Sequence, residues 1–159
     1  MTSPGGAPVA DARGRAEWRY SQLVVAPEGL DLERLAAVAA RHPSAQLVVV
    51  FGSVARGTPF RWSDVDIGVS GGEWLERLKL GAELGQLVGR EPHVVDLERA
   101  SEALRQEIAR DGLLVREALP GEWAHYRAKS FMRWFDLAPL RRRCAEGVRR
   151  RLRQEHAGG

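Results

Sequence analysis

Two aspartates separated by one residue carry the clearest chemical signal in this sequence. Asp64 and Asp66 flank the start of a predicted strand over residues 65–69, and side chains two positions apart in a strand point to the same face. Neighbouring carboxylates repel each other unless a cation lies between them. Mg²⁺ takes such oxygen ligands and leaves positions open for phosphate oxygens. If Asp96, on a later predicted strand, lies beside them, three carboxylates could hold two metal ions for a displacement at phosphorus.

A glycine–serine pair directly after a predicted buried strand, residues 47–51, supplies a place for phosphate. Gly52 lets the backbone approach a ligand closely, and the start of the following helix offers unpaired N–H groups. The Ser53 hydroxyl adds a donor. A Walker-A loop is excluded, because the residue after Gly57 is Thr58 and no lysine follows. The pattern therefore indicates phosphoryl or nucleotidyl transfer.

Each of these features also has a simpler explanation when it is taken alone. An Asp-x-Asp pair is often a solvated strand edge, a Gly-Ser pair after a strand is usually a turn, and Asp96 could cap a strand or helix. Their combination in this order and spacing is what favours a functional site.

The elements that must position these residues alternate between strands and helices, which predicts an α/β (α+β) fold. We predict strands over 47–51, 65–69, 93–97 and 113–115, and helices that start near Asp31, Trp74, Ser101 and Glu122. On the helix that starts near Trp74, one face is predicted to comprise Trp74, Leu78, Gly81, Gly85 and Val88, and its small residues would let the helix lie close to a sheet.

Composition and charge divide the chain into three segments. Residues 1–16 are rich in Gly, Ala and Pro and are predicted to be a disordered tail. Residues 17–120 form the predicted catalytic domain, and residues 1–120 together carry 14 basic against 17 acidic residues. Residues 121–159 form a predicted helical segment with 10 basic against 4 acidic residues. This segment could pack on the domain or on a partner, and its arginines could meet nucleic acid, an acidic protein or only solvent.

The stretches 52–57 (GSVARG) and 63–67 (SDVDI) resemble the signature of the polymerase-β-like nucleotidyltransferases. The short chain resembles the minimal nucleotidyltransferases (MNT). Residues 94–97, 104–108 and 111–112 are similar to the MntA-type antitoxins, which are encoded beside HEPN-domain toxins. The resemblance implies a polymerase-β-like fold, with a small mixed sheet flanked by helices and an appended C-terminal helical segment.

The resemblance also implies an activity. Such antitoxins transfer AMP from ATP to a tyrosine of the cognate HEPN ribonuclease toxin and thereby block it. By position, Asp64, Asp66 and Asp96 would be the catalytic and metal-binding carboxylates of a Mg²⁺ site, with two ions expected, and Asp96 would help to deprotonate the attacking hydroxyl. ATP would be the co-substrate and the HEPN toxin the partner.

The triphosphate would be bound, by the same resemblance, by Gly52 and Ser53, together with Arg56 and Ser63. For Arg56 two roles remain open, a phosphate contact or an ion pair with a nearby carboxylate that fixes the loop. Two readings also remain for Phe60 and Trp62, which could stack on an adenine or pack against the domain.

Other functions compatible with the sequence are a binding antitoxin that acts by occupancy, a small-molecule (aminoglycoside-type) nucleotidyltransferase, and an RNA-binding module, with direct nucleic-acid binding not favoured. His93, at a strand start, is predicted to be structural or exposed. Trp123, Phe131 and Trp134 are predicted to pack against the domain.

A cytoplasmic location without a membrane span is expected. The single cysteine, Cys144, excludes an internal disulfide and a cysteine metal cage. The longest strongly apolar run has five residues, too few for a membrane helix, and the opening residues lack the pattern of a secretory signal.

Overall fold

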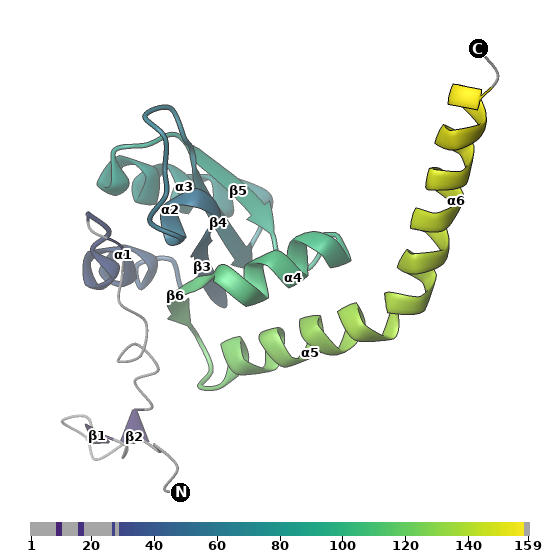
Figure 1. Ribbon diagram of the computed structural model, residues 1–159. Helices are drawn as coiled ribbons and strands as arrows, with labels where there is room; N and C mark the ends of the chain where they lie inside the picture. The colour runs from purple at the N-terminus through teal and green to yellow at the C-terminus, as the bar shows by residue number, and fades with distance from the viewer. Residues whose placement is uncertain (1–8, 11–15, 18–26, 28, 158–159) are drawn as a thin grey trace, which may run out of the picture.

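The structure, a computed structural model, describes residues 9–10, 16–17, 27 and 29–157. Its centre is a four-stranded mixed sheet in the order β5-β4-β3-β6 (Figure 1). The strands are β3 (Leu47–Phe51), β4 (Val65–Ser70), β5 (Pro92–Asp96) and β6 (Leu113–Glu117). β3 runs antiparallel to β4 and β6, whereas β4 and β5 are parallel. The predicted small mixed sheet flanked by helices is confirmed.

Within the described residues, six helices surround or extend from this sheet. They are α1 (Leu32–Ala39), α2 (Gly52–Ala55), α3 (Trp74–Val88), α4 (Glu102–Asp111), α5 (Glu122–Asp136) and α6 (Ala138–Ala157). Asp31 caps α1 by accepting from Arg34 N, and Ser101 caps α4 by accepting from Leu104 N, as side chains of this type do at helix starts.

The predicted tail is described only in part. β1 (Val9–Ala10) and β2 (Ala16–Glu17) pair as a two-stranded antiparallel ladder. The rest of residues 1–16 lies outside the described residues, so the tail stays a prediction.

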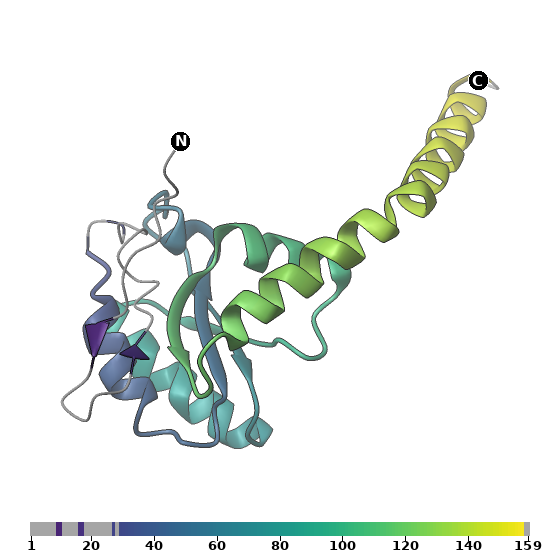
Figure 2. The ribbon, with the colours of Figure 1, turned by 90° about the horizontal axis from the view of Figure 1, so that it is seen from below.

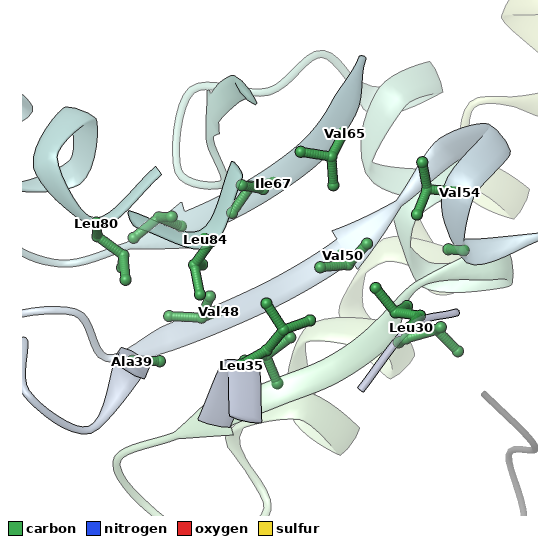
Figure 3. Packing of buried hydrophobic residues seen from close by; sticks show 14 of the residues in the cluster. Leu30, Leu35, Ala39, Val48, Val50, Val54, Val65, Ile67, Leu80 and Leu84 are labelled. Atoms are coloured by element: carbon green, nitrogen blue, oxygen red, sulfur yellow. The ribbon is translucent and has the colours of Figure 1, made fainter. Parts of the chain in front are cut away.

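The hydrophobic core lies on both faces of the sheet, and β3 is therefore buried along its whole length. On one face, Val48 and Val50 pack with side chains of α1 and α3 such as Leu35 and Leu84 (Figure 3). On the other face, residues of β3 pack with Ile108 of α4 and with a tryptophan of α5. The sheet is therefore a middle layer between two layers of helices, which is how a hydrophobic strand run becomes fully buried.

The predicted close packing of α3 on the sheet is confirmed, but the buried face of the helix is rotated relative to the predicted face. Its buried residues are Leu80, Gly81, Leu84 and Gly85, whereas Trp74 and Leu78 are exposed, so the predicted face was wrong at these two positions. A Cβ on Gly81 would overlap the side chain of Val94. Contact with β5 therefore sets the rotation of α3.

The C-terminal helices differ in how they contact the domain. α5 packs on α4: Trp123 is buried, Arg127 donates from Nε to Ala109 O at 2.9 Å, and Arg133 pairs with Glu102 at 3.1 Å. α6 points away from the sheet in both views (Figures 1 and 2). The packing predicted for Trp123 is confirmed. Within the described chain, no helix combines the length and apolar character needed to cross a bilayer.

Candidate functional site

The glycine that follows β3 lies against an aspartate of β4. Phe51 pairs with Asp66 in the antiparallel register, and Gly52 then turns the chain into α2 with φ +74°, a conformation that strongly favours glycine. A Cβ on Gly52 would overlap the Asp66 carboxylate at Oδ2. The absence of a side chain thus allows the backbone to run directly beside this carboxylate.

The two aspartates occupy the positions that the strand pattern predicts. Val65 and Ile67 are fully buried, while Asp64 is exposed and Asp66 is partly buried, with 28% of its side chain exposed. Asp64 immediately precedes β4 rather than lying within it. Both carboxylates are therefore on the open side of the start of β4, and that of Asp66 lies beside Gly52.

The loop before Asp64 is held by Arg90. Its guanidinium donates to Ser63 O at 2.7 Å and to Phe60 O at 3.0 Å, and Ser63 Oγ accepts from Phe60 N at 2.9 Å. The Ser63 hydroxyl thus closes a turn, and its predicted contact with the triphosphate stays a prediction. Phe60 and Trp62 are 81% and 84% exposed, so they do not pack against the domain.

Arg56 is engaged by carboxylates of α4. Its Nη1 lies 3.2 Å from Glu107 Oε1 and 3.1 Å from Asp111 Oδ2. The hydrogen bond from Arg110, together with that from Arg56, lowers the pKa of Asp111 below its ordinary value despite partial burial. Of the two roles left open for Arg56, the structure therefore shows the ion pair that fixes α2 to α4.

Asp96 does not join the other two aspartates, and the predicted three-carboxylate cluster is corrected here. It pairs in register with Val69, three residues along β4 from Asp66, which is about 10 Å at the rise of a strand. Because side chains alternate along a strand, an offset of three residues also places the Asp96 side chain on the face of the sheet opposite to Asp66. There it pairs with Arg77 of α3 at 2.7 Å and accepts from Glu98 N at 2.9 Å.

The residue that does face Asp66 from β5 is His93, whose place in the site the sequence did not reveal. The two are register partners on parallel strands, and His93 Nδ1 lies 2.9 Å from Asp66 Oδ1. The signal that could have located it is the pairing of β4 with β5, because the side chain directly across from Asp66 depends on this register.

The donor set suits a divalent ion shared with a nucleotide. No three His, Cys, Asp or Glu side chains among the described residues converge into a complete protein cage. Mg²⁺ is typically bound through one or two carboxylates plus substrate phosphates rather than by such a cage. Asp64 and Asp66 match that pattern, and Gly52, which has no side chain, brings its backbone against the Asp66 carboxylate.

Comparison with models of known protein families identifies the family of this chain. The model described as polymerase beta, nucleotidyltransferase matches residues 33–118, more than half of the chain. The chain belongs to the polymerase β nucleotidyltransferase family. The matched range of this nucleotidyltransferase contains the sheet, Gly52 and all the predicted site residues.

Relatives and solved structures agree with this family. Protein adenylyltransferase MntA of Shewanella oneidensis is 36% identical over 73 residues, 44% of this chain and 52% of that protein. The match thus spans about half the length of the curated relative. A crystal structure of a toxin–antitoxin with AMP-PNP has a TM-score of 0.63 at 24% identity, covering 75% of this chain and 98% of that one. A tri-AMPylated Shewanella oneidensis HEPN toxin in complex with MNT antitoxin has a TM-score of 0.56 at 20% identity, covering 74% and 98%. At these identities the two structures show the shared fold.

Proposed function

We propose that this nucleotidyltransferase is a Mg²⁺-dependent protein adenylyltransferase that transfers AMP from ATP to a tyrosine of a HEPN ribonuclease toxin and so neutralises it. The observation that carries the proposal is the approach of the Gly52 backbone to the Asp66 carboxylate. This arrangement joins the glycine–serine turn after β3 with a carboxylate suited to a divalent ion. The relative's name, protein adenylyltransferase, and the toxin–antitoxin structures of the same fold support the choice of reaction and partner.

The chemistry is a displacement at the α-phosphorus of ATP. The oxygen of the acceptor hydroxyl forms a bond to that phosphorus and its proton passes to solvent, while the bond to the bridging oxygen breaks and pyrophosphate leaves with the bonding electrons. Asp64 and Asp66 would hold the divalent ion, which when bound offsets the negative charge of the triphosphate. Gly52 and Ser53 would position the triphosphate, while Arg56 and Arg90 keep their flanking segments in place.

We assign the contact with the toxin to the C-terminal helices, which extend away from the sheet. α6 leaves the domain (Figure 2), and Met132, Phe135 and Leu140 of α5 and α6 expose more than half of their surface. The last 39 residues also carry the excess of basic residues. Exposed apolar side chains ringed by charge are typical of a protein-binding surface, so we assign α6 and the end of α5 to the toxin rather than to the domain.

Intact-mass spectrometry tests the proposed reaction. The product of the neighbouring gene, expected to be the HEPN toxin, is co-expressed with the wild type, with Asp64→Ala/Asp66→Ala, and with the control Glu33→Ala, an exposed carboxylate on α1. We expect increments of one AMP on the toxin with the wild type and the control, but none with the double variant. An unmodified toxin that copurifies with all three forms would contradict the proposed reaction and favour a binding antitoxin. Toxin that the double variant still modifies would refute the assigned site.

A further inference from the structure

The two oxygens of the Asp66 carboxylate face different neighbouring strands. Oδ1 lies 2.9 Å from Nδ1 of His93 on β5, whereas Oδ2 lies where a Cβ on Gly52 would overlap it. The register explains this division, because Asp66 pairs with His93 on one side of β4 and with Phe51, the residue before Gly52, on the other. One oxygen therefore contacts an imidazole, and the other lies beside the glycine–serine turn.

The hydrogen bond between His93 and Asp66 has a defined direction. An ionised carboxylate only accepts hydrogen bonds, so Nδ1 of the ring carries the hydrogen and donates it to Oδ1. Among the described residues, His93 is the hydrogen-bond partner of this carboxylate. Its ring is 63% exposed and so stands at the surface beside the site.

The Asp66 carboxylate needs such a partner to keep its oxygens in place. The last torsion of an aspartate side chain has a broad energy profile, so a carboxylate without a partner rotates over a wide range. Gly52 carries no side chain that could restrict this rotation. The hydrogen bond from His93 therefore selects the oxygen that lies on the Gly52 side.

The acidic residue of β5 is bound elsewhere. Asp96 lies on the opposite face of the sheet, where it pairs with Arg77 at 2.7 Å. Its move to the position of His93 would require a slip of β5 that breaks the pairing with β4. At this point β5 therefore contributes a hydrogen-bond donor rather than a third carboxylate.

We infer that His93 is a positioning residue of the proposed Mg²⁺ site: its Nδ1–H holds Oδ1 of Asp66, so that Oδ2 is the oxygen presented to the ion beside Gly52. The inference rests on the proposed function for the presence of the ion. Residues that hydrogen-bond to a metal ligand fix its orientation, and their loss lowers metal affinity by about 10- to 100-fold.

The tautomer of His93 tests the direction of the hydrogen bond. Nitrogen-15 NMR of the imidazole in the full chain, at about pH 8 where histidine is ordinarily neutral, distinguishes a hydrogen on Nδ1 from one on Nε2. We expect Nδ1–H in the wild type and Nε2–H in Asp66→Ala, because the carboxylate that selects Nδ1–H is then absent. A wild-type ring with its hydrogen on Nε2, or a tautomer that Asp66→Ala does not change, would overturn the inference.

Nucleotide binding tests the consequence for the ion. Isothermal titration calorimetry measures the affinity of the full chain for AMP-PNP over a range of Mg²⁺ concentrations and without Mg²⁺. His93→Leu removes the donor, whereas His93→Asn keeps an N–H donor on the nitrogen that is bonded to Cγ, as Nδ1 is. His125→Leu, at an exposed histidine of α5, is the matched control.

The expected pattern separates positioning from a general loss of structure. His93→Leu should raise the Mg²⁺ concentration needed for half-maximal AMP-PNP binding about 10-fold or more, while the affinity without Mg²⁺ stays as in the wild type. His93→Asn and His125→Leu should require nearly the same Mg²⁺ concentration as the wild type. A disrupted site would instead weaken binding both with and without Mg²⁺.

The outcomes also separate this inference from the proposed function. An unchanged Mg²⁺ requirement in His93→Leu, or a failure of His93→Asn to restore it, would overturn the role of His93 and leave the proposed reaction standing. Wild-type binding that does not depend on Mg²⁺ would overturn both the role of His93 and the Mg²⁺ dependence. A Mg²⁺ requirement that depends on His93, in a chain that transfers no AMP to the toxin, would support the positioning role and refute the proposed reaction.

Discussion

Gly52 and Asp66 are in contact without a side chain between them: a Cβ at position 52 would occupy the space of the Asp66 carboxylate. Two neighbouring strands create this relationship, since the glycine ends β3 and the aspartate lies near the start of β4. Any side chain at position 52 has to displace the carboxylate on which the proposed site depends.

Gly52→Ala is therefore expected to abolish AMP transfer. The substitution forces alanine into a left-handed conformation, at a cost of about 1–2 kcal/mol, and pushes the Asp66 carboxylate out of place. Mass spectrometry of the toxin measures transfer, and chemical denaturation measures the free energy of unfolding. Gly121→Ala is the matched control, because Gly121 also has a positive φ but a Cβ there meets nothing within 4 Å, so this variant should lose comparable stability and keep AMP transfer close to the wild type. Full activity of Gly52→Ala would contradict the arrangement.

Asp96→Asn is expected to lower stability but to retain AMP transfer. Burial alone would raise the pKa of Asp96, but the Glu98 N–H and the Arg77 guanidinium outweigh burial and lower it. A carboxyl whose pKa is lowered in the folded state stabilises the fold above its unfolded pKa and loses that effect as pH falls. We expect Asn to reduce the free energy of unfolding by about 1–3 kcal/mol at neutral pH, with the difference shrinking below about pH 4. Denaturant titrations at several pH values measure it, and loss of transfer in a well-folded variant would refute the structural role.

Arg56→Ala is expected to raise the pKa of Asp111 and to reduce AMP transfer, because α2 loses its tie to α4. Arg110→Ala provides the comparison. Arg110 makes the larger contribution to the lowered pKa of Asp111 but pairs with Asp111 from within α4, so its removal should raise that pKa and leave transfer unchanged. Carboxyl NMR titration follows the pKa. Equal losses of transfer in both variants would contradict a positioning role for Arg56.

Phe60→Ala and Trp62→Ala are expected to change the free energy of unfolding by less than about 0.5 kcal/mol, the usual range for exposed side chains. Both rings stand clear of the domain. Denaturant titration checks this, with Trp123→Ala as the buried comparison, for which a loss of about 3–5 kcal/mol is expected. Destabilisation by Phe60→Ala comparable to that of Trp123→Ala would show that the loop packs on the domain.

Deletion of residues 138–159 is expected to leave the thermal unfolding of the domain nearly unchanged while weakening toxin binding. α6 continues from α5 and points away from the sheet (Figure 1), whereas α5 carries the contacts with α4. Calorimetry measures unfolding and copurification measures binding. A truncated chain that binds the toxin as the full chain does would refute the assigned contact.

The local elements, and the residues whose chemistry depends on them, could be predicted from the sequence. Period-two burial around Val65 and Ile67 places Asp64 and Asp66 on the open side of β4, and the Gly52-Ser53 turn follows β3 as predicted, because these features need only a few consecutive residues. The register between β4 and β5 was decided by the tertiary structure. It brings His93 to Asp66 and sends Asp96 to Arg77, since a strand's alternation says which residues share a face but not which neighbour they meet. The rotation of α3 was decided in the same way, by the contact of Gly81 with Val94, which no pattern within the helix encodes.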